Sequence, residues 1–250
     1  MICAYAICPA DAPALPPPER GLGGTRLTAV RSDGLAAVCS RHRTLRPRPT
    51  PAQVLVHERV VEAVMARSPV LPFRFGTVLP DADRLAAVLD ERRDELLRAL
   101  THVRGRVELA VRALPREPAA AAGGAVAPRP RAAGARPAPG PAPAAGSARP
   151  APSSPTRGRD HLLARVERQR AVERVAAALH GPLAALAVDS AVRERPAPPA
   201  LFVGAYLVDA AAADRFRARA AALAGDDALA GAEVVVTGPL PPYDFAADPG

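Results

Sequence analysis

The chain has 250 residues, a length that allows one large domain or two of ordinary size. Hydrophobic residues make up 49% of it and aromatic residues only 3%, so its cores must be aliphatic and rich in alanine. The formal net charge is +8 and lysine is absent. The lack of lysine excludes Schiff-base chemistry, and the positive charge leaves nucleic acid or another acidic surface as partner classes.

Residues 1–114 predict a first α+β domain. The run MICAYAIC is typical of a buried strand, and Asp33–Gly34 between two short apolar runs predicts a hairpin. Thr50 can cap a helix that begins at Pro51, and residues 81–105 predict a second helix. We therefore expect a ferredoxin-like sheet in the order strand, hairpin, helix, strand, helix and strand, with its helices on one face.

The last strand of this domain is predicted over residues 106–114. Apolar and charged side chains alternate there, which is typical of a strand with one face on the core and the other in solvent. The side chains expected to face the core are Val107, Leu109 and Val111, and those expected to face solvent are Arg106, Glu108 and Arg112.

The segment from Pro115 to Gly158 separates this domain from the rest of the chain. It contains no leucine, isoleucine, methionine or aromatic residue, and it is rich in proline, alanine and arginine. Such a composition cannot bury enough apolar surface to offset the entropy that ordering would cost. We therefore predict a disordered linker over residues 115–158.

Residues 159–250 predict a second, smaller α+β domain. Its first element is an arginine-rich helix that starts near Arg159 and that we expect to break at Gly181–Pro182. Two neighbouring strands then flank a proline-rich turn. A helix over residues 210–225 precedes a last strand, which we expect Pro239 to end.

Three cysteines, Cys3, Cys8 and Cys39, predict neither a disulfide framework nor a zinc site, because their number is odd and no C-x-x-C occurs. Cys3 and Cys8 have opposite parity in the first strand, so we expect them on opposite faces. We interpret all three as small buried hydrophobic residues in a reducing cytoplasm. The N-terminus also lacks the basic region of a secretory signal.

No catalytic, cofactor or metal site is predicted. The run HERVV begins at His57 but has Val61 where a zinc protease needs a second histidine. The glycines of residues 21–24 lack the spacing and the lysine of a phosphate-binding loop, and Ser40 near His42 has no third partner for a triad. An enzyme would need a pocket with convergent titratable groups, and the spacing of the residues indicates none.

The run SPVLPFRFGTVLP, residues 68–80, holds the densest cluster of aromatic residues. We predict an extended strand with Leu71, Phe73 and Phe75 on one face and Val70, Pro72 and Arg74 on the other. Pro72 has no backbone donor, which favours the edge of a sheet. Two interpretations stay open: a core strand that anchors the helices, and an edge that presents backbone groups and Arg74 to a partner.

The block VHERVVEAVMARSPVLPFRFGTV closely resembles the signature of the gas vesicle protein GvpL/GvpF family. Further stretches resemble this family in the same order along the chain: MICAYAI, RGRVELAVRAL, GRDHLLARVERQR, ALFVGAYLVD and VVVTGPLPPYDF. The resemblance covers both predicted domains and leaves out only the linker. It implies a two-domain α+β protein whose N-terminal domain is ferredoxin-like.

The resemblance also implies a function. Members of the family are accessory or minor structural components of gas vesicles, and they are not known for catalysis. They associate with the hydrophobic shell protein and with other accessory proteins during assembly. For this chain we therefore expect a location in the cytoplasm or on the gas vesicle, no cofactor, no membrane and no nucleic-acid partner.

The predicted partner surface has two parts. The first is the edge formed by Pro72, Phe73, Arg74, Phe75, Gly76 and Thr77. The second is the arginine-rich helix over residues 159–174, in which Arg165 and Arg168 are the cations expected to matter. The alternative is a basic protein that binds nucleic acid or another acidic surface through this helix and the linker, with an affinity that falls steeply with salt.

Overall fold

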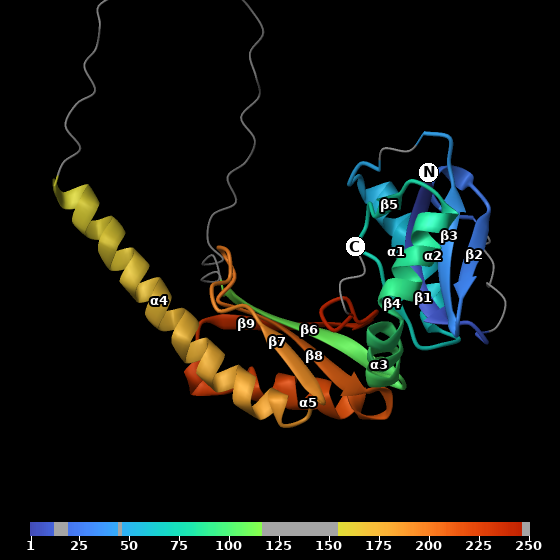
Figure 1. Ribbon diagram of the computed structural model, residues 1–250. Coiled ribbons are helices and arrows are strands. Elements are labelled where there is room, and N and C mark those ends of the chain that lie inside the picture. The colour runs from blue at the N-terminus through green and yellow to red at the C-terminus, as the bar shows by residue number, and fades with distance from the viewer. Residues whose placement is uncertain (13–19, 45–46, 117–154, 247–250) are drawn as a thin grey trace, which may run out of the picture.

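The computed structural model describes residues 1–12, 20–44, 47–116 and 155–246, which form two sheets with helices packed against them (Figure 1). The elements in chain order are β1 (Ile2–Pro9), the short 3-10 turn η1 (Leu22–Gly24), β2 (Leu27–Ser32), β3 (Leu35–Arg41), α1 (Pro51–Met65), β4 (Leu71–Pro72), β5 (Val78–Leu79), α2 (Ala82–Glu91), α3 (Arg93–Val103), β6 (Arg106–Pro115), α4 (Pro155–Ala184), β7 (Asp189–Val192), β8 (Phe202–Asp209), the 3-10 turn η2 (Ala210–Ala212), α5 (Ala213–Leu223), the 3-10 turn η3 (Asp227–Leu229) and β9 (Ala232–Leu240). The predicted mixture of helices and sheets is confirmed.

The predicted linker lies mostly outside the described residues, because residues 117–154 belong to no described element. Its two predicted ends are structured. Pro115 is the last residue of β6, and α4 already begins at Pro155. The first turn of α4 was therefore wrongly assigned to the linker.

The two sheets are antiparallel, and their strands follow the same order in space. The first has the order β2-β3-β1-β4, with β5 also paired to β1, and the second has the order β7-β8-β6-β9. The strand that comes first in the sequence is central in each sheet. Thus β1 lies between β3 and β4, and β6 lies between β8 and β9. The second set, from β6 through α4, β7, β8 and α5 to β9, is a split βαβ arrangement.

The strand β6 was predicted to close the first sheet, and that prediction is wrong. It pairs with β8 and β9 in the second sheet. The predicted alternation is confirmed on the core side, since Leu109 and Val111 are fully buried in the core under α4 and α5. Alternation identifies the buried face of a strand, but it does not identify the neighbouring strand, because strand pairing depends on residues far away in the chain.

The first sheet is covered on both faces, although we expected helices on one face only. Residues of α2 and α3 pack on one face, where Leu85, Leu89 and Leu96 are fully buried. The helix α1 packs on the other face through Val60 and Val61. The sheet can take a second layer because β1 is apolar at nearly every position and so has no polar face to leave in water.

A β-bulge in β1 overturns the prediction for the cysteines. The pairing of β1 with β3 shifts register between Ala4 and Ala6, so Tyr5 is an extra residue and the alternation of faces changes there. As a result Cys3 and Cys8 both lie in the core under α1, and not on opposite faces. All three cysteines are buried and unpaired, which confirms that they act as small hydrophobic residues.

The second sheet has helices on one face only. The helices α4 and α5 cover it, and Phe202, Tyr206 and Phe216 fill the core between them. The expected break of α4 at Gly181–Pro182 does not occur. Pro182 lies in the last turn, where the loss of one backbone donor is tolerated and the Ala185 amide still bonds to the Gly181 carbonyl, 3.1 Å apart.

A C-terminal tail, residues 241–246, connects the two sheets. The Tyr243 hydroxyl donates to Oε1 of Glu58 in α1 at 2.8 Å. The next amide, that of Asp244, donates to Oε2 of Glu108 in β6 at 2.9 Å. The last residues of the tail pack against the core under α2 and α3. The tail therefore connects β6, a central strand of the second sheet, to α1 and to the core of the first sheet.

Candidate functional site

The predicted edge, residues 68–80, forms two short strands with a turn between them. Both β4 and β5 pair with β1, and β4 ends the strand order of the first sheet, so the predicted edge position is confirmed. The Phe73 amide donates to the Tyr5 carbonyl at 2.8 Å, and the Ala4 amide donates to the Thr77 carbonyl at 3.1 Å. The chain leaves the ladder between these two bonds. Gly76, with φ of 92°, allows the reversal.

This turn changes which face the second phenylalanine occupies. Leu71 and Phe73 lie in the core under α2 and α3, as the alternation predicts. Phe75 was expected on the same face but lies instead against the core under α1, with its ring 5.7 Å from the His57 ring in an edge contact. An alternation rule assumes an unbroken strand, and this strand is interrupted.

Little of the predicted edge is open to a partner. Pro72 and Phe73 are buried, Arg74 is exposed, and the three residues that follow are half-buried. The Phe73 carbonyl accepts from His57 Nε2 at 2.9 Å, and the Arg74 carbonyl accepts from the Thr77 amide and hydroxyl. These backbone groups are used within the chain, which supports the core-strand interpretation for Phe73.

His57 is the buried histidine of the apolar face of α1. It is 0% exposed, and its Nε2–H donates to the Phe73 carbonyl, so Nδ1 carries no proton. Nδ1 is the one buried side-chain polar atom without a hydrogen-bond partner among the described residues. Burial lowers the pKa of His57, which keeps the ring neutral.

Ser40 and His42 join a buried network with Tyr5. The Ser40 hydroxyl lies 2.8 Å from the Tyr5 hydroxyl and 2.8 Å from His42 Nε2. The Leu22 amide donates to the same tyrosine oxygen. Burial raises the pKa of Tyr5 to about 12. The hydrogen-bond partners of these groups among the described residues include no carboxylate, so the network links η1, β1 and β3 and has no triad geometry.

The first half of α4 extends away from the rest of the structure (Figure 1). Three of its side chains are among the most exposed large apolar side chains of the described residues: Leu162 at 60%, Leu163 at 51% and Val166 at 48%. Their spacing places them on one side of the helix. Arg165, one of the predicted partner-binding cations, is exposed beside them. We call residues 162–166 the α4 stripe.

Arg168, the other predicted cation, has a different environment. Its guanidinium donates to the carbonyls of Pro196 at 3.1 Å and Ala200 at 2.8 Å, with a longer contact to Pro199. These bonds attach α4 to the turn that leads into β8. The guanidinium is used within the chain, so Arg168 is not part of the exposed surface that Arg165 offers.

The structure does not bring the two predicted surfaces together. The turn between β4 and β5 belongs to the first sheet, whereas the projecting end of α4 lies beyond the second sheet (Figure 1). A single small partner site made of both is therefore excluded. A partner would meet either surface alone, or an extended partner would meet both.

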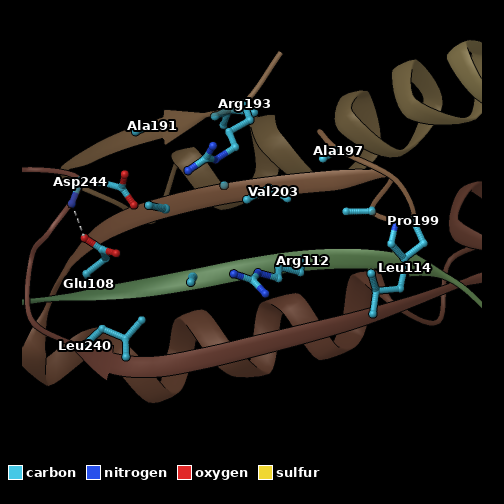
Figure 2. A pocket seen from close by; sticks show the side chains of 15 residues that line it. Glu108, Arg112, Leu114, Ala191, Arg193, Ala197, Pro199, Val203, Leu240 and Asp244 are labelled. Carbon is cyan, nitrogen blue, oxygen red and sulfur yellow. Dashed lines mark hydrogen bonds between the residues drawn. The ribbon is translucent and has the colours of Figure 1, made fainter. Parts of the chain in front are cut away.

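A third surface was not predicted. The uncovered face of the second sheet forms a groove of about 610 Å³, lined by β6, β7, β8 and the C-terminal tail (Figure 2). Glu108 points to this face as expected but is only 3% exposed, because the tail covers it. Burial raises the pKa of Glu108 to about 7. The sequence carried one signal: Ala110, Ala191 and Ala205 occupy positions where a solvated strand face normally carries polar side chains.

The groove has no catalytic constellation. Its ionisable side chains are Glu108, Asp244, Arg112 and Arg193, and none of its lining residues is a cysteine, serine, histidine or tyrosine. Within the described parts of the chain, no cluster of three potential metal ligands occurs. The helices described here also include none that is long and apolar enough to cross a bilayer.

Comparison with known proteins decides the family. Residues 2–247 match the family described as gas vesicle synthesis protein GvpL/GvpF. The chain belongs to the GvpL/GvpF family. This is a family of structural or assembly proteins of gas vesicles, and it is not a known enzyme family. The predicted family and gas vesicle role are confirmed at this level.

Two curated relatives carry the same family name. The chain is 32% identical over 116 residues to gas vesicle protein F of a Streptomyces species, which covers 46% of this chain and 49% of that one. It is 38% identical over 95 residues to gas vesicle protein F2 of Halobacterium salinarum, which covers 37% of this chain and 44% of that one. The chain thus matches about half the length of these GvpL/GvpF relatives.

Two solved structures share the fold. The crystal structure of GvpF from an Anabaena species has a TM-score of 0.67 at 16% identity, with 98% of this chain and 95% of that chain covered. GvpF from Microcystis aeruginosa gives 0.67 at 15% identity, with 98% of each chain covered. At such low identity the likeness shows a common GvpF fold.

Proposed function

We propose that the protein is an assembly accessory or minor structural protein of gas vesicles, which binds the hydrophobic shell subunit and other accessory proteins in the cytoplasm during vesicle formation. The observation that carries the proposal is the α4 stripe, where three large apolar side chains are about half exposed on a helix that projects from the rest of the structure. Soluble proteins seldom leave such a contiguous apolar surface uncovered unless a partner covers it.

The physical argument concerns the partner's exposed surfaces. A small apolar, strand-forming shell subunit has unpaired edges before assembly, and such edges aggregate. An apolar helix face that covers them, with Arg165 at its border to orient acidic groups, would keep the subunit soluble. The turn at residues 74–77 is a second candidate contact, and we keep it as part of the proposal.

The experiment is capture of the shell subunit by the full-length protein. We expect the double variant Leu162→Ser/Leu163→Ser to lose at least about tenfold in affinity, because two buried leucines would each contribute about 1–2 kcal/mol to an interface. The matched control is Leu55→Ser/Val188→Ser, which removes two similarly exposed apolar side chains elsewhere. Equal capture by both double variants and the wild type would contradict the α4 stripe as the binding surface.

The alternative is an acidic-surface or nucleic-acid binder. It rests on the exposed cations of α4, Arg159, Arg165, Arg170 and Arg174. The described part of α4 carries no aromatic side chain for base stacking, which disfavours this alternative. A gel shift at two salt concentrations tests it, because an electrostatic complex weakens steeply as salt rises.

We also propose that the N-terminal domain is a variant of the ferredoxin-like fold. Its sheet has the same strand order as the split βαβ arrangement of the second sheet. The variation lies in the connection from β1 to β2, where the described element is the short turn η1. A structure of this domain bound to a partner would show whether the connection between β1 and β2 changes its conformation.

A further inference from the structure

The groove on the second sheet has an ordered floor. Pairing of β7, β8, β6 and β9 places Ala191, Ala205, Ala110 and Thr237 side by side in one row across the strands. The next row consists of Arg193, Val203, Arg112 and Val235. A row of small side chains therefore lies beside a row that carries two cations, and the residues of both rows on β6, β7 and β8 line the groove.

The two arginines of the groove are available for a ligand. Arg112 comes from β6 and Arg193 follows the last residue of β7, and Figure 2 shows both side chains reaching over the same groove. Both are exposed, and neither guanidinium has an ion pair or hydrogen bond with any described residue. Other arginines of this sheet do have such partners, for example Arg106 with Asp209 at 3.2 Å.

The acidic end of the groove neutralises these cations only in part. Glu108 is fixed by the Asp244 amide at the far end. Its raised pKa, caused first by burial, keeps much of it protonated near neutral pH. The Asp244 carboxyl also lines this end of the groove, but two arginines against Asp244 and a partly protonated Glu108 still leave an excess of positive charge. The excess lies above an apolar floor, which suits a ligand with carboxylates on an otherwise apolar surface.

The spacing of the arginines selects the form of the ligand. Their backbones are separated by β8 and so lie two strand spacings apart, about 10 Å. Side chains seven residues apart on an α-helix lie on the same face and are also about 10 Å apart. In an extended peptide, positions three apart span this distance but point to opposite faces. A floor of alanines allows a helix to approach the sheet closely.

Two other occupants fit less well. A second copy related by a twofold axis would stack this face on itself and would bring arginines against arginines, which is unfavourable. A nucleic acid would meet a floor of alanine, valine and leucine, without an aromatic side chain on which a base could stack.

We propose that the groove over β6, β7 and β8 binds a helix of a partner protein that carries two carboxylates seven residues apart, with Arg112 and Arg193 pairing with them and small side chains of the helix packing on Ala110 and Ala205. This surface is separate from the α4 stripe, so the inference does not depend on the proposed mode of shell binding.

The test uses defined peptides and the full-length protein. The probe is a fluorescein-labelled, alanine-rich helical peptide of about 20 residues with glutamates at two positions seven apart, and its twin has glutamine at both. Fluorescence anisotropy should show saturable binding of the glutamate peptide, at least about tenfold tighter than the twin. The α4 variant Leu162→Ser/Leu163→Ser should bind it as the wild type does.

Charge exchange makes the test specific. The variant Arg112→Glu/Arg193→Glu should lose at least about tenfold in affinity and should instead bind a third peptide with arginines at the two positions. The control Arg215→Glu/Arg219→Glu changes net charge equally on the exposed surface of α5, at the other face of the sheet, and should change affinity less than about twofold.

A variant that leaves the charge of the groove unchanged gives a second test. Ala110→Leu fills the floor without a change of charge and should also abolish binding, with circular dichroism to confirm folding. The proposal is overturned if the glutamate peptide binds no better than its glutamine twin, or if the α5 control loses as much affinity as the groove variant. It is also overturned if single-stranded RNA binds the groove as tightly as the peptide, with the same dependence on both arginines.

Discussion

The two sheets of the molecule have the same strand order but differ in how they are covered. The first lies between α1 on one face and α2 with α3 on the other, whereas the second has α4 and α5 on one face and a groove on the other. In β1 every residue but the last is buried, while in β9 exposed and partly buried residues alternate after the first. One strand order can thus support a closed core or an open surface, and the side chains of the outer face decide which.

The difference in how the two sheets are covered implies different roles, one in stability and one in binding a partner. A side chain between two layers removes the most apolar surface from water, so the first sheet should contribute more to the free energy of unfolding. The open face of the second sheet can change its side chains at small cost, which leaves it available for a partner. Substitutions at matched positions in the two sheets can test whether the first sheet provides more of the stability than the open face of the second.

The largest effect is expected from a leucine pair. Leu71→Ala in β4 removes a fully buried side chain of the first sheet and should lower the free energy of unfolding by about 3–4 kcal/mol. Leu114→Ala in β6 removes the same atoms from the half-buried open face and should cost about 1 kcal/mol or less. Urea unfolding of both variants measures the difference in their free energies of unfolding. Similar losses would contradict the view that the first sheet contributes more to stability than the open face of the second.

A pH effect of intermediate size is expected from Glu108. Its pKa rises from an ordinary value of 4.5 to about 7, so the folded state binds more protons than the unfolded state between these values. Stability should therefore fall as pH rises through this window, by up to about 2–3 kcal/mol from this group. Glu108→Gln keeps an acceptor for the Asp244 amide and removes the titration.

The readout for Glu108 is the difference between two pH profiles. Thermal unfolding of wild type and Glu108→Gln would be followed between about pH 5 and pH 8. His57 has a lowered pKa and gives a slope of opposite sign, but both proteins contain it. Subtraction therefore isolates Glu108. Profiles that run parallel would mean that the tail does not bury this carboxyl in solution.

The smallest effect is expected from two arginines of one helix. Arg168→Ala removes the hydrogen bonds that attach α4 to the turn before β8, and should destabilise the protein by about 1–2 kcal/mol. Arg165→Ala, three residues earlier and exposed, should change stability by less than about 0.5 kcal/mol. Differential scanning calorimetry compares them. If the order were reversed, the assignment of Arg168 to an internal contact and Arg165 to the surface would be wrong.

Local sequence signals predicted local structure well. The turn at Asp33–Gly34 joins β2 and β3, and Gly34 has the positive φ that such a hairpin needs. Thr50 accepts from the Gln53 amide at the start of α1, and Asp81 caps α2. Each depends only on neighbours within a few residues, so the sequence contains the whole cause.

The surfaces could be predicted only in part. The edge position of Pro72 follows from a single residue and is confirmed. Arg165 is exposed, while its role in binding a partner stays a prediction. The internal role of Arg168 depends on carbonyls about thirty residues later, and the groove depends on the pairing of β6 with β8, which follows residues 117–154 in the chain. No pattern within one segment carries that information.

The sequence by itself determined which segments are helices or strands, which strand faces are apolar, and to which family the chain belongs, because periodicity and motif are properties of short stretches. Only the tertiary structure decided that β6 joins the second sheet, that the bulge at Tyr5 brings Cys3 and Cys8 to one face, and that the C-terminal tail buries Glu108. These outcomes depend on contacts between residues distant in the chain, where burial and strand pairing outweigh local preference.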